Sequence, residues 1–305
     1  MPARSPLTPD YIKDVNVRYH DAAAAEYDSK WGIDFGPIGQ EQVRGKLVKA
    51  LGEWPPESFG DALEIGSGTG YFSLNLVQLG AIERLMATDI SAEMLSTLST
   101  TAQRLGVTAE TRVTDAETLP FADESFDLVF GHAVLHHLPD LDRALAEFHR
   151  VLRPGGAIAF CGEPSRYGDL LAALPKRGAQ LAAPLWRLAL GASPRKPDAE
   201  ENGDGHELEP EVDVHAFAPA RLARMLGSAG FETVRISGEE LLANVYGWAV
   251  RTLEHTAEPD EVPYRWRELA FRGYIALQRV DTILLEPRLP PSIFYNLVLS
   301  ARKPV

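Results

Sequence analysis

The chain has 305 residues, of which 45% are hydrophobic and 24% charged, and its formal net charge is −13 at pH 7. This composition is typical of a globular protein, and the acidic excess disfavours binding to a phosphate backbone, so no nucleic-acid partner is expected. A single cysteine, Cys161, excludes an intramolecular disulfide bond. No apolar run approaches the roughly 20 residues that span a bilayer, and residues 1–10 contain no apolar signal core. We therefore expect a cytoplasmic protein without stable membrane insertion; the sequence indicates no oligomeric state.

The first part of the chain is predicted to be helical. Residues 11–30 and 37–51 have amphipathic patterns, and Trp54, Pro55 and Pro56 then break the chain. We expect residues 1–58 to form an N-terminal helical cap.

From residue 60 the pattern alternates between strands and helices. Strands are predicted at 62–65, 84–89, 109–113, 126–130 and 157–161, with helices at 70–79, after Ser91 (its N-cap) and at 140–152. Repeated β-α units of this size predict a parallel sheet with helices on both faces. A helix at 219–229 and strands at 231–236 and 293–300 continue the α/β pattern.

The most informative motif follows the first of these strands. Gly66, Gly68 and Gly70 stand at alternate positions before a predicted helix, and Glu64 lies within the strand. Glycines at these positions remove Cβ atoms that would block the approach of a nucleotide-like ligand to the backbone. The spacing G-x-G-x-G differs from the G-x-G-x-x-G of the dinucleotide fingerprint, which disfavours a nicotinamide-dependent oxidoreductase.

Further motifs follow the next strands in order. Asp89 ends the second strand, where a carboxylate accepts hydrogen bonds from ribose hydroxyls, although it would also suit NAD. Asp115 and Glu117 follow the third strand, and the segment from His132 to His137 follows the fourth. The sequence Arg153-Pro154-Gly155-Gly156 then forms a turn into the fifth strand.

These five motifs together make residues 59–160 resemble a class I S-adenosylmethionine-dependent methyltransferase of the small-molecule type. The branch it resembles includes the ubiquinone and menaquinone C-methyltransferases. The resemblance implies a Rossmann-like, doubly wound α/β sheet of seven strands, with the last strand antiparallel between the fifth and sixth. The cofactor-binding core would comprise residues 59–162, 215–238 and 289–305.

The resemblance also implies a site for S-adenosylmethionine, with S-adenosylhomocysteine as product. The glycine turn would wrap the methionine portion, with Glu64 near its amino group or supporting the turn. Asp89 would bind the ribose and Asp115 the adenine amino group, with Glu117 as the weaker candidate. The implied cofactor-binding residues are Glu64, Gly66, Ser67, Gly68, Thr69, Gly70, Asp89, Ile90, Asp115, Ala116, Glu117 and His132.

Histidines supply the catalytic candidates. His132 and His136 are placed to act as general bases, because imidazole titrates near neutral pH; a packing role is the alternative, and it is the one we assign to His137. No third ligand stands at a spacing that suits zinc, so no metal is expected. Methyl transfer also proceeds without a base where alignment and exclusion of water suffice.

Two insertions depart from the simplest form of the family. Residues 163–214 contain an apolar helical piece at 170–190 and the acidic stretch 198–213, which lacks Lys and Arg and is predicted to be a solvated loop. Residues 239–288 are predicted to be largely helical. Their apolar content suggests a lid over a hydrophobic acceptor. In related enzymes an aromatic segment like 27–31 closes over the cofactor; here it could instead only dock the first helix. The lid candidates are Trp186, Tyr246, Trp248, Phe271 and Tyr274, with a core of the lid itself as the alternative.

We therefore predict transfer of a methyl group from S-adenosylmethionine to a small, apolar acceptor at oxygen, carbon or nitrogen. Two alternatives remain at this point. One is a catalytically inactive protein that binds the cofactor or its product as a regulator or scaffold. The other, less favoured, is an NAD-dependent oxidoreductase. The acceptor itself is not indicated.

Overall fold

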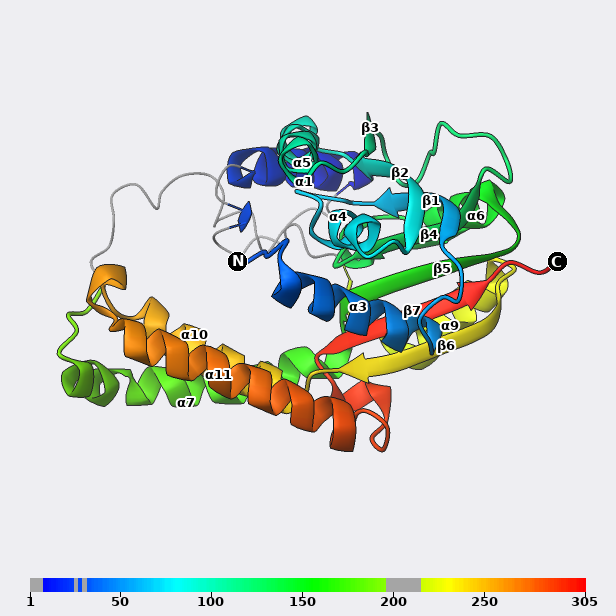
Figure 1. The fold of residues 1–305 in the computed structure, drawn as a ribbon. Coiled ribbons are helices and arrows are strands. Elements are labelled where there is room, and N and C mark those ends of the chain that lie inside the picture. Colours follow the sequence, from blue (N-terminus) through cyan, green and yellow to red (C-terminus); the bar gives the residue numbers. More distant parts are fainter. Residues whose placement is uncertain (1–7, 25–26, 29–31, 196–214) are drawn as a thin grey trace.

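A seven-stranded sheet forms the centre of the protein (Figure 1). The structure is a computed structural model that describes residues 8–24, 27–28, 32–195 and 215–305. The strand order is β3-β2-β1-β4-β5-β7-β6, and only β7 runs antiparallel to its neighbours. This confirms the predicted fold class, with the last strand between the fifth and sixth. The strands are β1 (Phe59–Ile65), β2 (Ile82–Asp89), β3 (Glu110–Val113), β4 (Phe126–His132), β5 (Leu152–Pro164), β6 (Glu232–Glu239) and β7 (Asn296–Arg302).

Helices cover both faces of the sheet and bury one apolar cluster on each. On one face Phe148 stacks on Phe160, with ring centroids 5.5 Å apart. On the other, Phe72 packs against Phe130 at 5.9 Å, and the cap helix α3 adds Val43. The helices around the sheet are α1 (Pro9–Ala23), α3 (Pro37–Leu51), α4 (Tyr71–Gln78), α5 (Ala92–Leu105), the short η1 (Leu135–His137), α6 (Leu141–Val151) and α9 (Pro219–Ser228).

Several strand boundaries differ from the prediction; β1, for example, begins at Phe59 rather than 62, and β6 ends at Glu239 rather than 236. β5 begins at Leu152 rather than 157. Residues 153–156, predicted to form a turn, belong to this strand and interrupt its regular pairing with β4. Phe126 pairs with Leu152, whereas Leu128 pairs with Ala157. The predicted start of the last strand at residue 293 is also wrong, because the 3-10 turn η4 (Pro291–Ile293) precedes β7.

Both insertions contain the helices that the sequence predicts. The helices α7 (Arg166–Leu190), α10 (Leu242–His255) and α11 (Tyr264–Val280) form a layer beyond the carboxyl end of β6, at the lower left of Figure 1. The short η2 (Pro259–Glu261) and the π-helical turn η3 (Asp281–Leu285) complete this helical layer. The acidic stretch 198–213 lies outside the described residues. No helix in the described ranges is both long and apolar enough to cross a membrane.

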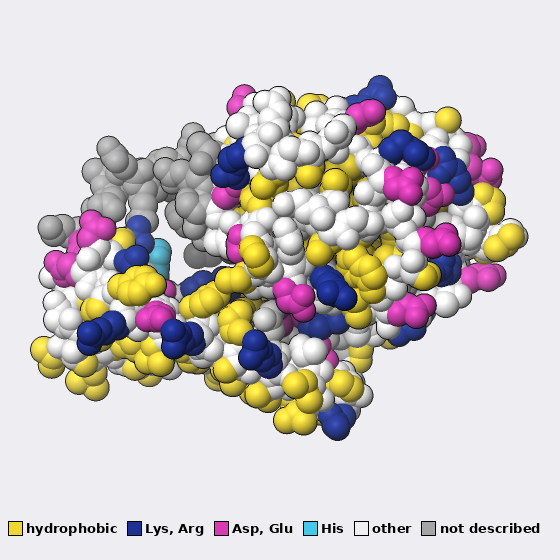
Figure 2. Space-filling model, in the orientation of Figure 1, with side chains coloured by type: hydrophobic (Ala, Val, Ile, Leu, Met, Phe, Trp, Pro, Cys, Tyr) yellow, Lys and Arg dark blue, Asp and Glu magenta, His cyan; other side chains and the backbone are white. Residues whose placement is uncertain are grey.

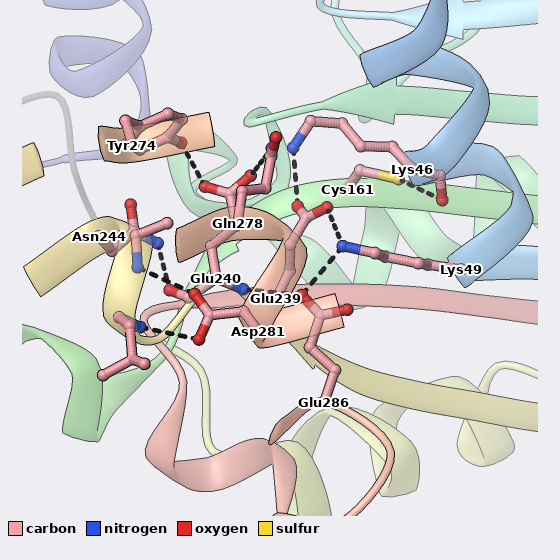
Figure 3. A network of polar contacts seen from close by, with 12 residues as sticks. Lys46, Lys49, Cys161, Glu239, Glu240, Asn244, Tyr274, Gln278, Asp281 and Glu286 are labelled. Carbon is pink, nitrogen blue, oxygen red and sulfur yellow. Dashed lines mark hydrogen bonds and ion pairs between the residues drawn. The ribbon is translucent and has the colours of Figure 1, made fainter. Parts of the chain in front are cut away.

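A buried polar network attaches the helical layer to the core (Figure 3). At the end of β6, the carboxylate of Glu239 binds the ammonium groups of Lys46 at 2.7 Å and Lys49 at 3.1 Å, both from α3. Lys49 also contacts Glu286 at 3.0 Å, just after η3. Despite burial, the two lysines lower the pKa of Glu239 to about 2. Three segments far apart in the sequence therefore share one ion-pair cluster.

The next residue, Glu240, extends this network into α11 (Figure 3). Its carboxylate accepts hydrogen bonds from the hydroxyl of Tyr274 at 2.5 Å and the amide of Gln278 at 2.7 Å. The buried Asp281 accepts the backbone N–H groups of residues 242 and 243 and so caps α10. The side chains in this network serve to hold the layer in place.

Candidate functional site

A pocket lies at the carboxyl ends of β1, β2 and β4, where open α/β sheets bind ligands. Its volume is about 790 Å³, with open solvent at its mouth included. The pocket brings together residues from the glycine turn, the ends of β2 and β4, the segment after β3, and helix α1. Seven of the predicted cofactor-binding residues line it: Gly66, Gly68, Asp89, Ile90, Asp115, Ala116 and His132. Glu64, Ser67, Thr69, Gly70, Glu117 and His136 do not.

The three glycines of the turn differ in what they permit. All have positive φ, of 59° at Gly66, 51° at Gly68 and 91° at Gly70. A Cβ at Gly66 would lie 2.3 Å from Cγ2 of Val134, and one at Gly70 would lie 2.8 Å from Cγ of Leu98, whereas at Gly68 it would meet nothing within 4 Å. The expectation that all three clear the way for a ligand stays a prediction, but the three have different surroundings. Gly66 and Gly70 permit packing within the protein, and only Gly68 has open space beside it.

Asp89 binds the turn directly. One carboxylate oxygen accepts the backbone N–H of Gly68 at 2.8 Å and the other accepts that of Ser91 at 2.9 Å. Burial raises the pKa of Asp89 above its ordinary value, against the opposing effects of His20 and of these backbone groups. A carboxylate offers about four acceptor positions, so Asp89 keeps capacity for a ligand hydroxyl.

Glu64 and Ser67 are buried beside the turn with incomplete hydrogen bonding. Oε2 of Glu64 and Oγ of Ser67 have no hydrogen-bond partner among the described residues. Burial raises the pKa of Glu64 to about 8, although the nearby Ser73 opposes the shift. Buried polar atoms without partners are rare in folded proteins, and a polar ligand group is one way to complete them.

Asp115 and Glu117 are joined by a residue that the sequence analysis missed. The ammonium of Lys13, from α1, donates to Asp115 at 2.7 Å and to Glu117 at 2.5 Å. Burial alone would lower the pKa of Lys13, but these two hydrogen bonds raise it. The other oxygen of Glu117 accepts the backbone N–H of Asp140 at 2.8 Å, so Glu117 links three segments. The available signal was the recurrence of Lys13, Asn16 and His20 on one face of α1, all of which line the pocket.

The N-terminal segment covers this pocket. The hydroxyl of Thr69 donates to Asp28 at 2.6 Å, and that of Ser91 donates to Asp21 at 2.5 Å. Tyr27 is part of the pocket wall. Residues 29–31, the rest of the predicted aromatic segment, lie outside the described residues.

The described part of the two insertions contributes no residue to this pocket. Trp186 packs against Trp266 with ring centroids 5.2 Å apart, and Trp248 packs against Tyr295 at 5.5 Å. Tyr274 binds Glu240, Tyr246 packs on Gly273, and Phe271 is half exposed. For most of these aromatic residues the structure shows packing within the helical layer and against the core.

His132 is the last residue of β4, and its ring is enclosed by aromatic side chains. Tyr71 and Phe72 lie 5.6 and 5.7 Å away between ring centroids. Its Nε2 atom is buried without a hydrogen-bond partner among the described residues. Burial lowers the pKa of His132 to about 3, so the ring is neutral at physiological pH and is a weak base.

His136 is held below the pocket by a second residue that the sequence analysis missed. Its Nδ1 lies 2.9 Å from Oε2 of Glu163, which is fully buried. Glu163 also accepts the backbone N–H groups of Val134, Leu135 and His136 at 2.9 to 3.2 Å. The carboxylate therefore fixes η1, and no pattern in the sequence connects residue 163 to that turn.

The neighbouring His137 lines the pocket instead. Its ring lies 3.9 Å from that of His136 and 5.8 Å from that of His20, between centroids. The assignment of His137 to packing alone is therefore incomplete. In the part of the chain that the structure describes, no group of three His, Cys, Asp or Glu side chains is arranged to hold a metal ion.

Comparison with known proteins places a methyltransferase domain at this site. Residues 63–160 match the family model described as a methyltransferase domain. A malonyl-[acyl-carrier protein] O-methyltransferase from Methylococcus capsulatus is 39% identical over 142 residues, which are 46% of this chain and 48% of that protein. The chain thus spans about half the length of the curated relatives it matches.

Solved structures share the fold at low sequence identity. A Haemonchus contortus phosphoethanolamine N-methyltransferase 2, in complex with phosphomonomethylethanolamine and S-adenosylhomocysteine, has a TM-score of 0.60 at 15% identity, over 96% of this chain and 60% of that one. The [4+2]-cyclase SpnF has a TM-score of 0.54 at 18% identity, over 87% of this chain and 82% of that one. Residues 63–160 therefore match a methyltransferase domain, and the chain shares the fold of these solved structures.

Proposed function

We propose that this chain transfers a methyl group from S-adenosylmethionine to a small-molecule acceptor. The observation that carries the proposal is the contact of 2.8 Å between the carboxylate of Asp89 and the backbone N–H of Gly68, at the wall of a pocket within a methyltransferase domain. When bound, S-adenosylmethionine supplies an electrophilic methyl group on a positively charged sulfur. The fold neighbour described as a cyclase shows that the fold alone does not specify the reaction.

The described residues fit this cofactor. Gly68 leaves backbone open to a ligand, and Asp89 keeps acceptor capacity for ribose hydroxyls. Asp115 lines the pocket and suits the adenine amino group, whereas the buried Glu64 lies outside the lining and would support the turn. We propose that Ser67, Thr69, Gly70 and Glu117 support this wall from behind, and that Ile90 and Ala116 contact the ring system.

The chemistry we propose depends on alignment and exclusion of water. Helix α1 covers the pocket, with Lys13 binding its acidic wall, so a bound acceptor would be shielded from solvent. Val134 and Leu138 give the pocket an apolar side that suits an apolar acceptor. Because the pKa of His132 is about 3, we assign it to packing and positioning rather than to proton removal. His136 would act through its contact with Glu163, the residue that fixes η1.

The acceptor is to be identified by assay. Malonyl-acyl carrier protein is named for the curated relatives, and it therefore belongs in the test panel beside phenols, amines, small carboxylic acids and lipidic quinones. The protein would be incubated with S-adenosylmethionine labelled in the methyl group, and each acceptor would be examined for the label.

Two results decide this test. Label in one acceptor class, dependent on Asp89, supports the proposal and reveals the methylated atom. Tight binding of S-adenosylhomocysteine with no label in any acceptor contradicts methyl transfer and favours a binding protein without catalysis.

A further inference from the structure

The outer face of α7 carries a continuous row of exposed apolar side chains. This α7 stripe consists of Tyr167, Leu171, Leu174, Leu181, Leu185 and Leu188, spaced by alternating steps of three and four residues with Gly178 at the one gap. Leu181 is 84% exposed and Leu188 is 78% exposed. A stripe with this period lies along one side of a helix about 37 Å long. The opposite side, with Ala172, Ala179 and Ala183, is buried.

The helices α7 and α11 of this layer have an excess of basic residues, whereas the protein as a whole is acidic. The chain as a whole has a net charge of −13. In contrast, α7 contains Arg166, Lys176, Arg177 and Arg187 with one acidic residue, and α11 contains four arginines with one acidic residue. Figure 2 shows Lys and Arg side chains along the front of this layer and hydrophobic side chains along its lower rim.

Three of the α11 arginines form an exposed row. Arg265, Arg272 and Arg279 recur every seven residues and therefore lie on one side of the helix. Both α7 and α11 pack against α10, so the leucine stripe and the arginine row belong to one helical layer (Figure 2). Apolar side chains beside a row of cations are the features of a helix that binds at a lipid interface.

We propose that the helical layer docks on an anionic phospholipid surface through the α7 stripe and the α11 arginines. Leucines would enter the boundary of the acyl chains while arginines contact headgroup phosphates. A second copy of this chain fits less well, because a two-fold contact along the stripe would place two copies of a helix with an excess of basic residues against each other. The proposal does not depend on methyl transfer.

The test is co-sedimentation of the full-length protein with vesicles, without cofactor. Vesicles of phosphatidylcholine mixed with phosphatidylglycerol would be compared with vesicles of phosphatidylcholine alone, at low and high salt. We expect binding to the anionic vesicles, which salt weakens, and about tenfold less binding to the neutral ones. No binding to anionic vesicles, or equal binding to both, overturns the proposal.

Matched variants locate the surface. The double variant Leu181→Asp with Leu185→Asp should reduce binding about tenfold or more, as should Arg265→Glu with Arg279→Glu. Ile38→Asp, at a 51% exposed site on α3, is the control that should bind as the wild type does. Thermal unfolding would verify that each variant is folded.

The competing occupant has its own signature. Its signature is a dimer in sedimentation that Leu181→Asp dissociates, together with no binding of the wild type to vesicles. In that case the stripe is an interface between two copies, and the lipid proposal is wrong. Loss of binding in Ile38→Asp to the same extent as in the stripe variant would also overturn it.

Discussion

Gly66 and Gly68 stand two residues apart in the turn after β1, yet the structure constrains them differently. Both have positive φ, which costs an L-residue about 1–2 kcal/mol. Only at Gly66 would an added Cβ also collide with Val134. A glycine pattern in a sequence therefore indicates a turn but does not tell which glycine serves the ligand.

The two positions can be separated by substitution with alanine. Gly66→Ala should lower the free energy of unfolding by about 2–5 kcal/mol, because overpacking adds to the backbone strain. Gly68→Ala should cost only the strain but weaken binding of S-adenosylhomocysteine, since its Cβ would occupy open space beside Asp89. Urea unfolding and calorimetry measure both quantities, and equal losses of stability in the two variants would refute this distinction.

His132 provides a test of the proposed chemistry through pH. Burial lowers its pKa from 6.5 to about 3, so its ring stays neutral above that range and supplies no titration between pH 5 and 8. The pH profile of kcat/KM should therefore keep its shape in His132→Asn, even if the rate falls. A wild-type inflection near pH 6 to 7 that disappears in His132→Asn would instead identify it as the base.

At the scale of elements, helix α1 is the cover of the site. It reaches the pocket wall through Lys13, which binds Asp115 and Glu117, and through Asp21, which binds Ser91. Sequence alone indicated an amphipathic N-terminal helix but not its position. Placing it requires ion pairs between residues about one hundred positions apart, and no local pattern encodes such pairs.

Removing the Lys13 contact should loosen this cover. Lys13→Gln should weaken binding of S-adenosylhomocysteine about three- to tenfold, mainly through faster dissociation, because a partly buried ammonium with two carboxylate partners contributes more than an exposed pair. Arg18→Gln is the control on the same helix, since Arg18 is half exposed and its ion pair among the described residues is with Asp14.

Stopped-flow kinetics with a fluorescent cofactor analogue would measure the dissociation rate. Tighter binding in Lys13→Gln would show that Lys13 competes with the cofactor for Asp115, contrary to its proposed role as a cover.

For the molecule as a whole, the ion-pair cluster around Glu239 joins the core to the helical layer. The pKa of Glu239 falls from 4.5 to about 2 in the folded protein. A lowered carboxylate pKa contributes stability that is complete above pH 4.5 and is lost as the pH falls toward 2. The loss for this one group is about 3 kcal/mol.

The variant Glu239→Gln tests this contribution. It should lower the free energy of unfolding at pH 7 by about 3–5 kcal/mol, because Lys46 loses its buried partner, and it should flatten the decline between pH 4.5 and 2. Glu268→Gln, which removes an exposed pair with Arg272, should cost less than about 1 kcal/mol. If the free energy of unfolding declines equally between pH 4.5 and 2 in Glu239→Gln and in the wild type, Glu239 is not the source of this pH dependence.

The sequence predicted the sheet and seven of the residues that line the pocket, and the same physical reasons explain what it did not predict. The strand at 62–65 and the helix after Ser91 follow from local periodicity and capping, and Asp89 and Asp115 follow from the ends of strands. The roles of Lys13, Glu163 and His136 could not be predicted, because they rest on contacts between separate segments of the chain. The insertions were predicted to be helical but not to pack beside β6, because an apolar pattern does not tell which surface it will cover.

The central claim is that the pocket beside Gly68 and Asp89 binds S-adenosylmethionine. Calorimetric titration with S-adenosylhomocysteine tests it most directly, with Asp89→Ala as the variant and the exposed Asp142→Ala as the control. We expect one binding site in the wild type, no binding of NAD, and an affinity at least about tenfold weaker in Asp89→Ala, because hydrogen bonds to a carboxylate are worth about 1.5–3 kcal/mol. An absence of binding, or the same dissociation constant in Asp89→Ala and the wild type, would contradict the claim.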